Sequence, residues 1–107
     1  MKDKTINLST YCARELKLLA GRDKGIEMRK RIKLEEYESN KDISFINIEV
    51  PEYIKTMTSS YILGLVGIYI EKYGEIQFRN KYNFKCNDVT KNNIEIAIKY
   101  VITNMEV

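Results

Sequence analysis

The chain has 107 residues, 44% of them hydrophobic, and a formal net charge of +3. This length allows one domain, and the apolar content can build a core, which excludes a disordered segment. There is no histidine, and the two cysteines, Cys12 and Cys86, are far apart in the sequence. The commonest general base and metal ligand is therefore missing, and we expect no catalytic residues, no metal and no cofactor.

The sequence also predicts a cytoplasmic protein that does not contact membranes. Residues 1–7 carry charges with no apolar run behind them, which does not fit a signal peptide. The longest uncharged stretch, residues 56–70, would span about 22 Å as a helix, short of the roughly 30 Å of a bilayer core. The cysteines are then expected to be reduced thiols. The mild net charge does not favour a nucleic-acid partner.

In the first part of the chain, apolar and polar residues alternate over residues 5–9, which predicts a short strand. Residues 10–20 fit either a short helix or a packed loop. The glycines and charges of residues 21–25 predict a turn. Residues 26–37 are rich in helix formers and predict a helix, and polar residues 39–42 break the chain after it.

The second part of the chain begins with the clearest strand, residues 43–50, whose apolar residues fall on both faces. We expect it to be central, with helices covering it. Residues 58–73 predict a nearly all-apolar helix that Gly74 ends, and residues 75–79 predict a third strand. Residues 80–87 are ambiguous, and their alternation permits a short edge strand. Residues 91–105 predict a last helix, with candidate N-caps at Asp88, Thr90 and Asn92.

This order of elements predicts one α/β domain over residues 1–107, with helices packed on a small mixed sheet of about four strands. The expected core consists of apolar residues from the central strand and from the two long helices: Ile46, Ile48, Leu63, Val66, Ile98 and Val101. The eight tyrosines fit either an interface or positions between core and surface.

A basic segment is the first candidate site. Residues 17–33 hold seven basic residues against two acidic ones. Gly21 and Gly25 beside a helix start resemble a backbone nest for an anion, which Arg22, Lys24 and Arg29 could complete. We expect a positive φ at one of these glycines and an Arg22 side chain that points away from solvent. The alternative is a solvated helix face balanced by the acidic residues that follow.

The second candidate site is the entrance to the apolar helix, where Thr58, Ser59 and Ser60 follow one another. Ser and Thr are favoured N-caps because their oxygens accept the free N–H groups of the first turn. A helix N-terminus also stabilises added negative charge, so a serine here is a candidate for phosphorylation. A single N-cap needs only one hydroxyl group, and this segment offers more than one. Two interpretations therefore remain open, a helix cap and a modification site.

These two segments resemble a known family. Residues 21–32 (GRDKGIEMRKRI) resemble the G-R-x-x-G-x-x-x-R-x-x-(apolar) segment of the bacterial STAS-like domain of unknown function. Residues 57–63 (MTSSYIL) resemble that family's I-T-S-S-F-x-(apolar) entrance to its second helix, which follows a central strand. The resemblance covers roughly residues 5–103 and implies an α/β STAS-like fold.

The STAS-like family is similar in turn to anti-sigma factor antagonists, in which Asp-Ser-Ser-Gly precedes the helix and a kinase phosphorylates the second serine. By position, Thr58 stands for the aspartate, Ser59 and Ser60 for the serines, and Tyr61 for the glycine. The resemblance implies a protein partner, such as a histidine-kinase-like ATPase, and no catalytic residues.

Two functions follow from these features. The first is a non-enzymatic, partner-switching regulator that binds an ATPase or kinase-type protein, or another copy of itself, through Thr58, Ser59 and Ser60. The second is a small-ligand or nucleotide sensor that binds an anion at Gly21, Arg22, Lys24, Gly25 and Arg29.

Overall fold

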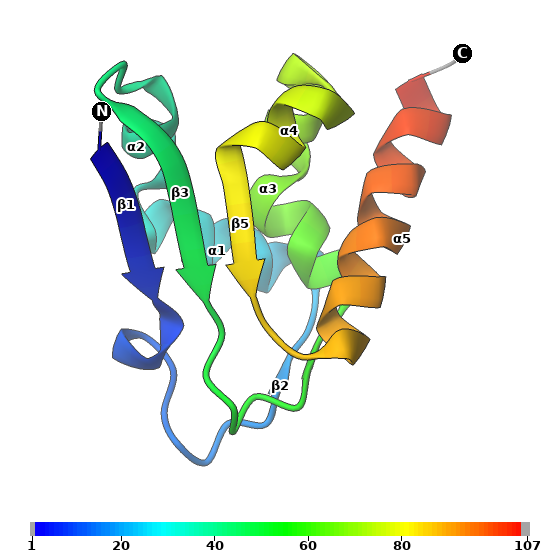
Figure 1. Ribbon diagram of the computed structural model, residues 1–107. Helices are drawn as coiled ribbons and strands as arrows, with labels where there is room; N and C mark the ends of the chain where they lie inside the picture. Colours follow the sequence, from blue (N-terminus) through cyan, green and yellow to red (C-terminus); the bar gives the residue numbers. More distant parts are fainter. Residues whose placement is uncertain (1, 106–107) are drawn as a thin grey trace.

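Three parallel strands form the main sheet of the computed structural model, which describes residues 2–105 (Figure 1). The strands are β1 (Lys2–Asn7), β3 (Ile43–Glu49) and β5 (Tyr82–Lys85), and β3 lies between the other two. A second parallel pair, β2 (Leu18–Leu19) and β4 (Thr56–Met57), forms a separate sheet of two strands. The chain is thus an α/β domain, and the expectation of one mixed sheet of about four strands is wrong.

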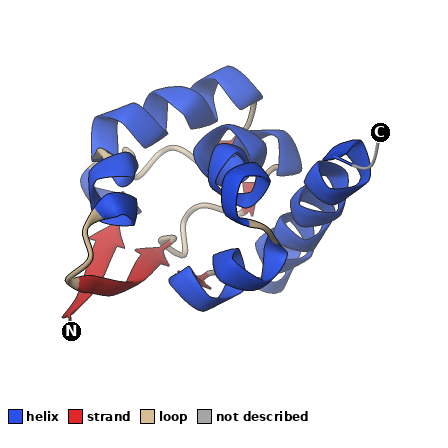
Figure 2. Cartoon of the chain, turned by 90° about the horizontal axis from the view of Figure 1, so that it is seen from above, coloured by secondary structure: helices blue, strands red, loops and turns tan. Residues whose placement is uncertain are grey.

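The helices are η1 (Leu8–Thr10), α1 (Arg22–Ile32), α2 (Leu34–Ser39), α3 (Ser59–Tyr73), α4 (Glu75–Lys81) and α5 (Asp88–Met105). Helix α3 packs between α1 and α5. In Figure 1, α1 and α3 lie behind the sheet, and the view from above in Figure 2 shows most of the helical residues on that side of the strands. The molecule therefore has two layers.

Only one face of the main sheet is covered, which corrects the expectation of helices on both sides. Ile46 and Ile48 are fully buried on the helix side, whereas Phe45 is 47% exposed on the other side. The uncovered face carries a polar row across the three strands: the Asn47 amide donates to Thr5 Oγ1 at 3.4 Å, and the Asn83 amide donates to Asn47 Oδ1 at 3.3 Å. Polar side chains that bond to each other let this face remain in contact with water.

The expected core is confirmed with one exception. Ile46, Ile48, Val66, Ile98 and Val101 are all buried. Leu63 is partly buried and packs against this cluster. The core thus lies between the covered face of the sheet and the layer formed by α1, α3 and α5.

Two predicted elements differ in the structure. The helix expected over residues 26–37 is two helices, because Lys33 adopts a left-handed conformation with φ of 66° and ends α1 before α2 begins. Residues 75–79 lie in helix α4 rather than in a strand. Helical geometry buries Phe78 and leaves Ile76 78% exposed, so the alternation of these two apolar residues was misleading.

The remaining elements agree with the sequence or refine it. Helix α3 ends before Gly74, and β5 lies within residues 80–87, where the sequence permits an edge strand. Residues 11–17 form a loop between η1 and β2 in which Cys12 is buried and residues 13–17 are exposed, rather than a helix or a fully packed loop. Helix α5 begins at Asp88 and is capped by a residue we did not select: Asn87 Oδ1 accepts from the Thr90 N–H at 2.9 Å.

Candidate functional site

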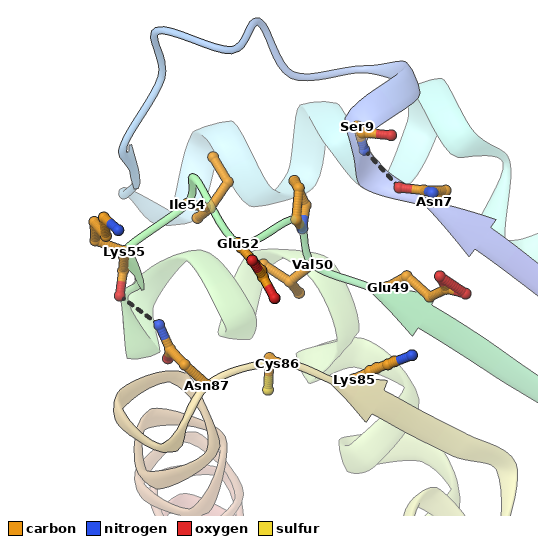
Figure 3. Close-up of a pocket in the computed structure, with 11 residues that line it drawn as sticks. Asn7, Ser9, Glu49, Val50, Glu52, Ile54, Lys55, Lys85, Cys86 and Asn87 are labelled. Carbon is orange, nitrogen blue, oxygen red and sulfur yellow. Dashed lines mark hydrogen bonds between the residues drawn. The ribbon is translucent and has the colours of Figure 1, made fainter.

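The carboxyl ends of parallel strands are where ligands and partners usually bind in open α/β sheets. In this chain, β1, β3 and β5 end around a cavity of about 660 Å³ (Figure 3). The segment that follows β3, residues 50–55, forms one wall, and residues 85–87 form the facing wall. The lining combines polar and charged residues with apolar ones: Asn7, Ser9, Glu49, Val50, Pro51, Glu52, Ile54, Lys55, Lys85, Cys86 and Asn87.

The groups in this cavity are suited to hydrogen bonding and charge recognition. Glu49 and Lys85 are paired neighbours on β3 and β5, so opposite charges lie side by side at its edge. Burial raises the pKa of the Cys86 thiol, with Lys91 lowering it and Asp88 raising it to smaller extents. Cys86 therefore carries its proton at neutral pH, when a thiolate would be needed for nucleophilic attack.

The same edge of the fold holds the entrance to α3. Thr58 is the N-cap: its Oγ1 accepts from the Tyr61 N–H at 3.2 Å, and its own N–H donates to the Leu19 carbonyl at 2.9 Å. Ser59 is half-buried and Ser60 is exposed. Of the three predicted residues, Thr58 satisfies the helix terminus and Ser60 presents its hydroxyl to solvent.

Helix α5 holds this entrance in place through polar side chains that the sequence analysis missed. The Met57 N–H donates to Thr90 Oγ1 at 3.2 Å, and the Asn93 amide donates to the Met57 carbonyl at 3.0 Å. Asn87 extends the contact by donating to the Lys55 carbonyl at 2.9 Å. Thr90 is completely buried. Of these three residues the sequence suggested only Thr90, and only as a cap, because their partners lie more than thirty residues away.

The second predicted site does not have the expected form. Gly21 has the predicted positive φ, 94°, and precedes α1. Helix α1 begins at Arg22, however, so Gly25 lies inside the helix rather than in a turn. Gly25 is buried against α3, where an added Cβ would lie 2.1 Å from the Tyr61 carbonyl oxygen. This glycine lets two helices approach closely and does not offer its amide to an anion.

The three basic side chains of that prediction lie in different environments. Arg22 is exposed, contrary to expectation, and forms no ion pair within residues 2–105. Lys24 is 3.5 Å from Glu27 on the surface of α1. Arg29 is bound to Glu38 inside the protein. The structure therefore does not bring Gly21, Arg22, Lys24, Gly25 and Arg29 together around one anion.

Arg29 and Glu38 form the most buried ion pair of the described chain, and only 14% and 7% of their side chains are exposed. Two bonds of 2.9 and 2.5 Å join the guanidinium to the carboxylate, and Arg29 also donates to the Leu65 carbonyl at 3.0 Å. The Tyr82 hydroxyl donates to Glu38 at 2.5 Å. The network ties α1 to α2, α3 and β5.

The pKa values of this network follow from its burial. Burial acts to lower the pKa of Arg29, but the hydrogen bond and charge of Glu38 outweigh it and raise that pKa. Burial, followed by the charge of Glu38, raises the pKa of the Tyr82 hydroxyl well above its ordinary value. Arg29 therefore stays charged and Tyr82 stays neutral, which suits a structural role.

Within residues 2–105, no group of three or more carboxylate or cysteine side chains could hold a metal ion. No helix in this part of the chain combines the length and apolar character needed to cross a membrane. Comparison of the chain with protein-family models, curated proteins and solved structures gives no match.

Proposed function

We propose that this chain is a STAS-like regulatory domain that binds a protein partner at the entrance of α3. The observation that carries the proposal is the contrast within that helix: Ser60 is exposed in the first turn, whereas Tyr61, Ile62 and Leu65 directly behind it are buried. A partner can thus reach the serine without disturbing the core. The resemblance of residues 21–32 and 57–63 to the STAS-like family supports the same reading.

The fixed position of the entrance also supports the proposal. Bonds from Thr90 and Asn93 of α5 hold Met57, and the Leu19 carbonyl holds Thr58. A surface that is rigid before binding loses little conformational entropy when a partner docks. The segment 50–55 leads from the cavity at the strand ends into β4 and this entrance, which extends the surface available to a partner.

Partner switching would use Ser60. A phosphate there would lie at a helix N-terminus, where the helix dipole favours negative charge, so the fold would survive the modification. A partner that packs closely on the entrance would meet about two new negative charges. Modification would therefore weaken binding without unfolding the domain. The class of partner that we propose is a histidine-kinase-like ATPase.

The test compares Ser60→Asp with Asn80→Asp, which adds the same charge at an exposed position of α4. Each variant is melted and is mixed with histidine-kinase-like ATPases purified from the source organism, and complexes are counted by native mass spectrometry. We expect both variants to melt like the wild type and only Ser60→Asp to lose the complex. Equal binding by all three proteins would contradict the proposed site.

A further inference from the structure

A second cavity, of about 470 Å³, lies between α1, the first turns of α3 and the loop that leads to β2. Its volume is within the range of small-molecule sites, roughly 300–1,000 Å³. The walls are mainly apolar, with Leu16, Leu18, Leu19 and Met28 among them. Leu16 and Leu18 are 39% and 52% exposed, so apolar surface borders the opening. This cavity is separate from the one at the strand ends.

One buried polar atom in the wall of this cavity has no partner. Tyr61 is 2% exposed, and its hydroxyl makes no hydrogen bond within residues 2–105. Buried hydroxyls in native proteins are almost always bonded, because an unbonded one loses its interaction with water and gains nothing in return. Tyr61 lines the cavity while its hydroxyl is covered by neighbouring atoms, so a molecule that enters can accept a hydrogen bond from it once a covering side chain turns away.

The charges at the opening favour an acceptor that is negative. Lys24 is matched by Glu27 at 3.5 Å. Arg31 has no carboxylate within ion-pair distance in the described chain; its guanidinium lies 5.2 Å from the ring centre of Tyr11 and donates to the Tyr11 carbonyl at 3.5 Å. One positive charge at the opening is thus left unmatched.

Cys12 links the guanidinium to the hydroxyl. Burial raises the pKa of the Cys12 thiol, and the charge of Arg31 lowers it in part. Burial, followed by the influence of Cys12, raises the pKa of Tyr61 well above its ordinary value. Arg31 therefore acts on Cys12 and Cys12 acts on Tyr61, and all three residues line the cavity. At neutral pH, the thiol and the hydroxyl are both neutral hydrogen-bond donors beside one cation.

We propose that this cavity binds a small monocarboxylic acid with an apolar body. The carboxylate accepts a hydrogen bond from the Tyr61 hydroxyl and faces the Arg31 guanidinium. The apolar body contacts the leucines of the loop and Met28 of α1. The proposal does not depend on the partner-binding surface at Ser60, so each can fail without the other.

Octanoate, octanol and octylamine are suitable probes because they share a chain and differ in the head group. Titrations followed by calorimetry and by amide chemical shifts compare the wild type with Tyr61→Phe and Arg31→Gln. Tyr73→Phe is the matched control, because Tyr73 lies on the same helix and is 44% exposed. The chemical shifts must locate binding at the loop that leads to β2 and at α1.

We expect octanoate to bind the wild type more tightly than octanol or octylamine does. Tyr61→Phe should weaken octanoate binding by about tenfold, the effect of losing one hydrogen bond to a charged group, while Tyr73→Phe leaves it unchanged. Arg31→Gln should weaken the binding of octanoate but not the binding of octanol. Tyr61→Phe should melt no lower than the wild type, since its hydroxyl has no partner to lose.

Several results would overturn the proposal. The first is the absence of saturable octanoate binding, and the second is equal affinity for octanoate in the wild type and in Tyr61→Phe. The others are tighter binding of octylamine than of octanoate, and changes in amide chemical shift that are confined to the strand-end cavity. A lower melting temperature for Tyr61→Phe would also contradict it, because the hydroxyl would then have a structural partner.

Discussion

Gly25 of α1 and Gly64 of α3 meet where the two helices cross, and neither position has room for a side chain. A Cβ on Gly25 would lie 2.1 Å from the Tyr61 carbonyl oxygen, and one on Gly64 would lie 2.0 Å from the Arg22 carbonyl oxygen. Both obstacles are backbone atoms, which cannot rotate away as a side chain can. This crossing sets the distance between α1 and α3, and with it the position of the α3 entrance.

Gly64→Ala should therefore be strongly destabilising. Pushing the two backbones apart would disrupt packing along the whole crossing, and we expect a loss of about 3 kcal/mol in the free energy of unfolding, the upper end for overpacked cores. Urea unfolding measures it. Gly67→Ala, on the same helix, is the control: its Cβ would meet Leu63 at an ordinary 3.7 Å, so we expect a gain of up to about 1 kcal/mol. Equal effects of the two changes would contradict the role of the crossing.

The Arg29–Glu38 pair predicts a second difference in stability. Glu38→Gln leaves the Arg29 guanidinium buried without a matching charge, which should cost about 3 kcal/mol. Glu95→Gln removes a carboxylate that is paired with Arg79 on the surface, where 56% of its side chain is exposed, and should cost less than about 1 kcal/mol. Chemical unfolding of both variants under one condition tests this order. A larger loss for Glu95→Gln would refute it.

Stability should fall at alkaline pH because of buried tyrosines. Burial raises the pKa of Tyr61 and Tyr82 in the folded chain, whereas both titrate near about pH 10 when unfolded. Above that pH the unfolded chain has lost protons that the folded chain keeps, so stability falls by about 1.4 kcal/mol per pH unit for each such group. Below about pH 10 this contribution is fully present.

The variant Tyr61→Phe isolates one of these contributions. Its unfolding free energy should fall less steeply than that of the wild type between about pH 10 and 11, because one titrating group is gone. Urea titrations across this range give the two slopes. Parallel curves would show that Tyr61 ionises equally in both states and would contradict its burial.

The α3 entrance predicts a separation between stability and binding. Thr58→Ala removes the oxygen that accepts the Tyr61 N–H and should cost about 1 kcal/mol. Ser60→Asp adds a charge to an exposed position that the helix dipole favours, so its free energy of unfolding should change by less than about 0.5 kcal/mol. Thermal melts of the two variants measure these changes. A large loss for Ser60→Asp would make Ser60 a structural residue.

Much of the fold could be predicted from local patterns. The strand at residues 43–50, the helix entrance at Thr58 and the apolar stripe of the last helix all depend on neighbouring residues, and the structure contains each of them. Helix α4 could not be predicted in the same way. Ile76 and Phe78 alternate as in a strand, but no partner strand is available, and Phe78 packs with Tyr82 as part of a helix.

The candidate site could be predicted only in part. The exposed Ser60 behind a capping Thr58 follows from the rules for helix starts. The environments of the basic side chains do not follow from local rules, because they depend on contacts between residues that are distant in sequence. Gly25 meets Gly64, and Arg29 is bound to Leu65 as well as to Glu38. A glycine for close packing and a glycine for anion binding look identical in one sequence.

The most direct test of partner binding at the α3 entrance is site-specific photo-cross-linking in native cells. A photoreactive amino acid replaces Ser60 in one variant and Asn80, at an exposed position of α4, in the other. The account predicts one discrete cross-linked product from position 60, containing a histidine-kinase-like ATPase, and none from position 80. No product from position 60, or the same product from both positions, would contradict it.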